Sequence, residues 1–195
     1  DRLRNVGQPV VLYENAQFSL VAGVIGGDVR AAVASTVVER AVASEARFGG
    51  GLDNGDHPMV YVDVDTDPAT IDSSSADLVL PAGAVPTSAT LYLGADVGAG
   101  AGGAEAPDIA AAGWAMVTTP AGLTVPVAPE RVDWVDTKYQ AVLDVTSLVQ
   151  GAGGGWWTVG GVQAGTGEGV YAGWALVVTY EDAAAPVRSL VVLDG

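Results

Sequence analysis

The sequence predicts an all-β protein, an antiparallel β-sandwich of jelly-roll-like type with one short helical turn. Apolar residues make up 49% of the 195 residues and charged residues only 16%, a composition typical of chains that bury a core. Short β-prone runs also recur at regular spacing between Gly- and Pro-rich turns, without a tandem repeat, as in sandwiches and jelly rolls. We expect a single domain, residues 1–195, in which 1–58 is the less regular part with long loops.

The strands follow from period-2 alternation bounded by turn residues. They are expected at 10–13, 17–21, 76–80, 88–95, 113–119, 123–127, 131–135, 139–145, 155–162, 171–180 and 187–193. A further strand starts at Met59 and ends at Pro68. Alternation along it predicts that one set of residues enters the core and the other faces outward: Val60, Val62 and Val64 inward; Tyr61, Asp63 and Asp65 outward.

Three other segments are not simple strands. Residues 31–41 fit a helix by the spacing of their valines, yet their β-branched density equally favours a strand. The Ala- and Gly-rich stretch 94–113 predicts a long surface loop. A helical turn at 144–151 is expected to be capped by Asp144 or Thr146 and to stop at Gly151.

The charge balance excludes some partners. The chain carries 23 acidic and 8 basic residues, a net charge of −15, which repels nucleic acid and anionic membranes. No Lys or Arg occurs between Arg47 and Arg131. The chain also has no cysteine, so disulfides and thiolate metal sites are excluded.

No apolar run is long enough for membrane insertion, and the first residues lack a signal-peptide core. We therefore expect either an intracellular protein or a processed, mature chain.

The acidic segment after Met59 is the candidate metal site. Seven aspartates lie between Asp53 and Asp77 inclusive, and calcium takes six to eight oxygen ligands of this kind. The spacing does not match an EF-hand, because Gly and Glu are missing where that loop needs them. We name calcium as a possible cofactor and assign it four ligands: Asp63, Asp65, Asp67 and Asp72. The alternative is structural: Asp67 caps a turn at Pro68, and Asp72 makes local turns with the serines that follow it.

The tryptophans are candidates for binding. In the adjacent pair Trp156 and Trp157 only one ring can face the core of a strand. Exposed rings stack on sugars or anchor protein interfaces, whereas the alternative is that they cover one end of the sandwich. The candidate ligand or interface residues are Trp134, Trp156 and Trp157.

Catalysis has little support in the sequence. His57 is the sole histidine, and no Gly-x-Ser-x-Gly elbow is present. We expect a protein that is not an enzyme. Lys138, the sole lysine, raises the idea of an isopeptide crosslink to a carboxyl or carboxamide group, which would require a buried, neutral amine.

Three stretches together resemble a known module. They are 59–75, with Tyr61-Val62-Asp63-Val64-Asp65 before a serine run; 139–150; and 163–195, with Tyr171-Ala172-Gly173-Trp174 followed by an apolar strand. They resemble an uncharacterised β-rich module near the N-terminus of large exported bacterial, actinobacterial-type cell-surface proteins that carry repeated sandwich domains. The resemblance implies an extracellular, cell-surface location and a structural role, and it implies no enzymatic activity.

The two ends of the chain are candidates for strand exchange. Apolar, β-prone runs at chain ends can pair with a sheet edge of a neighbouring subunit. The residues concerned are Val10, Val11 and Leu12 at one end and Leu190, Val191 and Val192 at the other. We therefore predict a non-enzymatic structural or adhesive surface protein that binds copies of itself or other surface proteins, as a filament or surface-layer subunit. The alternative is a carbohydrate-binding module that uses an exposed tryptophan.

Overall fold

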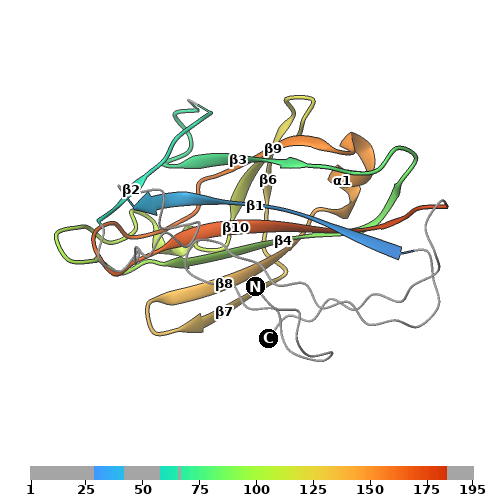
Figure 1. The fold of residues 1–195 in the computed structure, drawn as a ribbon. Coiled ribbons are helices and arrows are strands. Elements are labelled where there is room, and N and C mark those ends of the chain that lie inside the picture. Colours follow the sequence, from blue (N-terminus) through green and yellow to red (C-terminus); the bar gives the residue numbers. More distant parts are fainter. Residues whose placement is uncertain (1–28, 42–57, 66, 184–195) are drawn as a thin grey trace, which may run out of the picture.

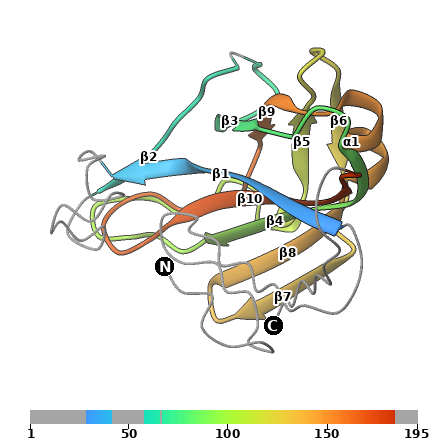
Figure 2. The ribbon, with the colours of Figure 1, turned by 45° about the vertical axis from the view of Figure 1, so that its right-hand side comes forward.

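The computed structural model describes residues 29–41 (backbone only), 58–65 and 67–183. Two antiparallel sheets pack face to face, which confirms the predicted all-β sandwich (Figures 1 and 2). The six-stranded sheet has the order β2-β1-β10-β4-β8-β7, and the four-stranded sheet has the order β3-β9-β5-β6. The strands are β1 Val29–Ala41, β2 Met59–Tyr61, β3 Ser73–Leu78, β4 Val85–Asp96, β5 Ala115–Thr118, β6 Thr124–Val127, β7 Arg131–Val135, β8 Lys138–Asp144, β9 Gly155–Gly160 and β10 Ala172–Glu181.

The core lies between the two sheets. Leucines of β4 and β8 and Trp174 of β10 face Leu78, Val117, Trp157 and Val159 of the smaller sheet, and all are buried. Burying each such side chain contributes about 1.5–3 kcal/mol to the free energy of folding. The indole N–H groups keep partners in the core: Trp174 Nε1 donates to Ser74 Oγ at 3.0 Å and Trp157 Nε1 to the Gly153 carbonyl at 3.2 Å.

The undecided segment 31–41 is a strand. It forms most of β1, which pairs along its length with β10, for example Ala34 with Leu176. The long-range ladder with β10 therefore overrides the helical spacing of the valines.

The strand expected from Met59 to Pro68 was predicted wrongly in length and in orientation. β2 has only three residues, Met59 is buried, and Val60 and Val64 are exposed. Beyond Tyr61 the backbone turns away to bond with Ser73, whose N–H donates to the Val62 carbonyl and whose Oγ accepts from the Val64 N–H. Hydrogen bonds to Ser73, the first residue of β3, thus end β2 at Tyr61, although the alternating sequence predicts a strand that continues to Pro68.

The serine run belongs to a strand, not to a turn. β3 starts at Ser73, three residues before the predicted strand at 76–80. The Ser74 and Ser75 hydroxyls bond to Trp174 Nε1 and Thr158 Oγ1. Because each hydroxyl has a partner, serine can occupy a sheet position at little cost.

The stretch 94–113 is less of a surface loop than predicted. β4 continues to Asp96, and the following segment contains the short helix η3, Ile109–Ala111, and the buried residues Val97, Ala106 and Ala112. A side chain at Gly103 would overlap the backbone of Thr166. Glycine therefore lets this segment pack directly against residues 165–168.

The predicted helical turn is present as α1, Thr146–Ala152. The predicted cap was wrong: the N-cap is Val145, which makes no side-chain capping bond, although Asp144 Oδ1 accepts from the Thr146 N–H at 2.9 Å. The helix stops at Gly153, with φ of 71°, and not at Gly151. Val149 of α1 joins the core, so the helix covers one end of the sandwich. Within the described ranges, no helix has the length and apolarity to cross a membrane.

Candidate functional site: the outer face of the four-stranded sheet

The outer face of the four-stranded sheet carries an exposed aromatic ring at β9. Side chains alternate along a strand, and the core residue Trp157 points inward, so its neighbour Trp156 points outward. Trp156 is 64% exposed and Trp157 is 1% exposed. The prediction that only one ring of this pair faces the core is confirmed. Trp157, however, was wrongly named as a candidate ligand residue, because it is a buried core residue.

A row of four hydroxyl groups crosses this face next to Trp156. The strand registers place Ser75, Thr158, Thr118 and Thr124 side by side on β3, β9, β5 and β6. Ser75 and Thr158 are joined at 2.7 Å, and Thr118 and Thr124 at 2.8 Å. Each hydroxyl can donate one hydrogen bond and accept two, so the row keeps unused capacity for a ligand.

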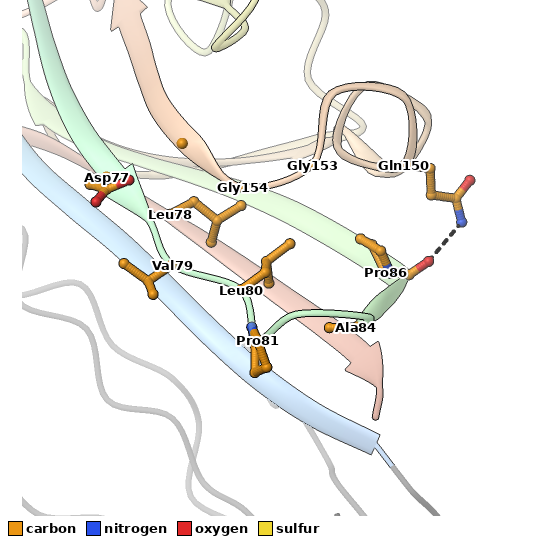
Figure 3. A pocket seen from close by; sticks show the side chains of 11 residues that line it. Asp77, Leu78, Val79, Leu80, Pro81, Ala84, Pro86, Gln150, Gly153 and Gly154 are labelled. Carbon is orange, nitrogen blue, oxygen red and sulfur yellow. Dashed lines mark hydrogen bonds between the residues drawn. The ribbon is translucent and has the colours of Figure 1, made fainter. Parts of the chain in front are cut away.

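At the Trp156 end, a polar hollow adjoins the face. Asp77 is the register partner of Trp156 on β3 and lines a hollow of about 520 Å³ beside α1 (Figure 3). Gln150 of α1 also lines it, with its Nε2 bonded to the Pro86 carbonyl at 3.1 Å. Asp77 and Gly155, the two neighbours of Trp156 in register and in sequence, therefore line this hollow, although Trp156 itself does not.

At the opposite end, a smaller cleft of about 340 Å³ contains Trp114. Trp114 precedes β5 and is 48% exposed. Met116 and Pro126 form apolar parts of the wall, and Asp108 and Gln163 contribute polar groups. The sequence reasoning placed Trp114 in a strand but did not select it as a site residue. Its position two residues before the outward-facing Met116 could have indicated exposure.

Trp134 lies apart from this face, on β7 of the larger sheet. Its ring centroid is 5.3 Å from that of Tyr139, its register partner on β8. The ring is 45% exposed and covers a buried tyrosine. This position fits the structural alternative, in which a tryptophan covers the end of the sandwich.

The aspartates proposed as calcium ligands form hydrogen bonds within their own loop. Asp63 Oδ1 accepts from Ser73 Oγ at 2.8 Å, Asp65 Oδ1 from the Asp67 N–H at 2.8 Å, and Asp67 Oδ1 from the Ala69 N–H at 2.9 Å. Hydrogen bonds of this kind are expected from the structural alternative, in which the aspartates cap turns and bind no metal. No group of three acidic or histidine side chains in the described ranges is arranged to hold a metal ion. Calcium binding stays a prediction, and melting temperatures in calcium and in chelator would test it.

Asp72 differs from the other three because it is fully buried. Its Oδ1 accepts from the Val162 N–H at 2.8 Å, and its Oδ2 has no hydrogen-bond partner in the described part of the chain. Burial raises the pKa of Asp72 to about 8, and the nearby charges of Asp63 and Asp65 add to the effect. The carboxyl is therefore mostly neutral at pH 7.

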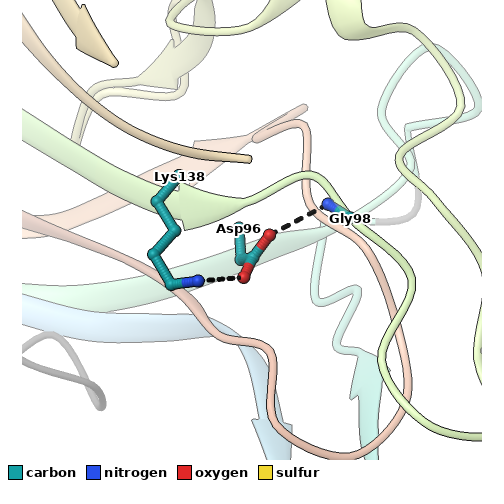
Figure 4. A network of polar contacts seen from close by, with 3 residues as sticks. All are labelled: Asp96, Gly98 and Lys138. Atoms are coloured by element: carbon teal, nitrogen blue, oxygen red, sulfur yellow. Dashed lines mark hydrogen bonds and ion pairs between the residues drawn. The ribbon is translucent and has the colours of Figure 1, made fainter. Parts of the chain in front are cut away.

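Lys138 forms an ion pair and is not suited to an isopeptide bond. Its Nζ lies 2.8 Å from Asp96 Oδ2, while Asp96 Oδ1 accepts from the Gly98 N–H at 3.0 Å (Figure 4). Burial raises the pKa of Asp96, but the bonds from Lys138, Thr137 and Gly98 outweigh it, so that the net shift is downward. The bond to Asp96 raises the pKa of Lys138. Both groups are charged, whereas a crosslink requires a neutral amine.

The strand-exchange residues Val10, Val11, Leu12, Leu190, Val191 and Val192 lie outside the described residues, and so does His57. No protein-family model, no curated protein and no solved structure matches this chain. The resemblance to an exported surface module thus stays a prediction.

Proposed function

We propose that this protein is a non-enzymatic, extracellular adhesive module of a bacterial surface protein, and that it binds carbohydrate on the outer face of the four-stranded sheet. The observation that supports this most is Trp156, 64% exposed beside a row of four hydroxyls on a sheet surface. Exposing a large ring to water costs free energy, and Trp156 shares this side of the molecule with the 48% exposed Trp114 and its apolar cleft, which together support a binding surface.

Trp156 and the hydroxyl row match the two sides of a sugar. The apolar C–H face of a pyranose packs on an indole ring, and its hydroxyls exchange hydrogen bonds with Ser and Thr. Burying about 100 Å² of apolar surface on Trp156 contributes about 2.5 kcal/mol. Affinity for a single sugar is therefore weak, and an adhesive protein gains strength from many linked copies.

The negative net charge of the protein indicates which carbohydrates can bind. A surface with a net charge of −15 repels acidic polysaccharides. Asp77, the exposed register partner of Trp156, adds a local negative charge at the ring. We therefore expect uncharged or cationic sugars and not anionic ones.

The test is a glycan-array screen followed by titration calorimetry with Trp156→Ala. Loss of binding in this variant supports the function, provided that the variant melts like the wild type. Trp134→Ala is the matched control, because this ring is 45% exposed but lies on the other sheet. Unchanged glycan binding in Trp156→Ala would refute the proposed function.

A second candidate role is self-assembly through the terminal strands. β7 is an edge of the six-stranded sheet, and no described strand pairs with its outer side. Val29 pairs with Glu181, which brings the start of β1 beside the end of β10. The first residue of β1 and the last residue of β10 therefore lie at the same end of the sheet. Electron microscopy should show filaments or lattices that disappear when residues 1–13 are deleted, and a monomer at high concentration would refute assembly.

A further inference from the structure

We propose that the carbohydrate-binding face continues from Trp156 to the cleft at Trp114, so that the ligand is an extended, uncharged polysaccharide and not a single sugar. This inference rests on the proposed function and names the ligand class and a second subsite for it.

The strand registers place the two tryptophans on one line. Thr158 of β9 pairs with Thr118 of β5, and two residues further along, Gly160 pairs with Met116. Trp156 lies two residues before Thr158 in β9, and Trp114 lies two residues before Met116, directly before β5 begins. Because β9 and β5 are antiparallel, the two tryptophans lie at opposite ends of this strand pair. Trp156, Thr158 and Gly160 share the outer face of β9 because they are two residues apart. Trp114 lies on the same side because it lines one cleft with Met116. The separation is six residues along antiparallel strands, or about 20 Å, which a chain of several sugar residues would span.

The strip between the rings is suited to a sugar chain. The hydroxyl row crosses it next to Trp156, and Met116 and Pro126 provide apolar surface next to Trp114. An extended polysaccharide alternates hydroxyl edges with apolar C–H faces, so both parts of the strip have a counterpart in it.

The Trp114 cleft adds polar groups that can orient the chain. Gln163 Oε1 accepts from the Asp108 N–H at 2.9 Å, which holds the amide in place. Its Nε2 carries two hydrogens and makes one long bond of 3.4 Å, to the Gly161 carbonyl. Asp108 Oδ1 accepts from the Ala110 N–H, and a carboxylate has two oxygens, so acceptor capacity is left for a sugar hydroxyl. The cleft therefore offers a ring, a donor and an acceptor.

The charges at the two ends select against anionic chains. Asp77 lies at the Trp156 end and Asp108 at the Trp114 end. Among the basic residues whose side chains the structure describes, Lys138 and Arg131, neither lines the hollow at Asp77 or the cleft at Trp114. An uncharged chain avoids the desolvation and repulsion that an acidic polysaccharide would meet at both ends.

The experiment measures affinity against ligand length. The probes are β-1,4-linked glucose oligomers and β-1,4-linked N-acetylglucosamine oligomers, each from dimer to hexamer, titrated into the full chain by calorimetry. We expect affinity for one series to rise by about tenfold from dimer to hexamer, the gain of one further stacked ring. Trp114→Ala should remove that gain and leave dimer binding unchanged, whereas Trp156→Ala should weaken every length. Trp134→Ala should match the wild type.

The outcomes separate the two proposals. If Trp156→Ala abolishes binding but hexamer and dimer bind equally well, or if Trp114→Ala leaves the hexamer gain intact, the second subsite is refuted and the proposed function stands. If Trp156→Ala changes nothing, both proposals are refuted. If neither series binds the wild type, the extended-chain ligand is refuted, and the glycan array decides the proposed function. Each variant replaces an exposed or half-exposed ring, and equal melting temperatures show that the fold is retained.

Discussion

Asp72→Asn should make the protein more stable at neutral pH, with a gain that grows as pH rises. Asp72 is 0% exposed, and burial raises its pKa to about 8. Asparagine has almost the same shape and keeps an oxygen to accept from the Val162 N–H. It also places an amide N–H₂ where the protonated carboxyl has its O–H, but it does not titrate.

The direction follows from proton binding in the two states. The unfolded chain releases the Asp72 proton near its ordinary pKa of 3.8, whereas the folded protein keeps it up to about pH 8. The folded state therefore binds one more proton in this window, and the stability that Asp72 contributes is complete below pH 3.8 and is lost as pH rises through 8. At pH 7 the loss is about 4 kcal/mol, from about three pKa units at ~1.4 kcal/mol each. This is a large part of the 5–15 kcal/mol typical of a domain.

Urea unfolding of both proteins between pH 4 and 8 measures the effect. The other carboxyl groups titrate in both proteins, so their contributions cancel in the difference between the two unfolding free energies. That difference should shift by about 4 kcal/mol in favour of asparagine between pH 4 and pH 7. A buried amide N–H₂ without an acceptor among the described residues at the Oδ2 position adds a cost that is the same at every pH. Asp77→Asn, an exposed site on the same β3 strand, is the control and should show a small difference at every pH. A constant difference across the range would refute the buried, neutral Asp72.

The remaining predictions concern packing. Trp157→Ala should lower the unfolding free energy by about 3–5 kcal/mol, because it empties a core position. Trp156→Ala should change it by about 0.5 kcal/mol or less, and equal losses in the two variants would contradict the assigned faces. Gly103→Ala should lower the melting temperature strongly, because its Cβ would overlap Thr166, whereas Gly151→Ala in α1 meets open space and should add about 1 kcal/mol. Thermal melts measure both, and a Gly103→Ala variant that melts like the wild type would contradict the close backbone approach at Thr166.

Local pattern was enough to predict most of the fold. Between β4 and β10 the strands were expected to within a few residues, because alternation and turn residues act over neighbouring positions. The helical turn at α1 was also predicted, because Asp144 and the glycines after Val149 are local signals. For the candidate site, alternation alone required that one of Trp156 and Trp157 face outward.

Tertiary contacts decided the rest. Which ring is buried depends on the register of β9 against β3 and β5, and those partners lie far away in the chain. The same holds at Met59, where pairing with β1 and a bond to Ser73 set the length and orientation of β2. The line from Trp156 to Trp114 exists only because two distant strands pair in one register. A sequence thus determines by itself which side chains share a strand face, because alternation is local, whereas strand pairing across the chain decides which of those faces meet.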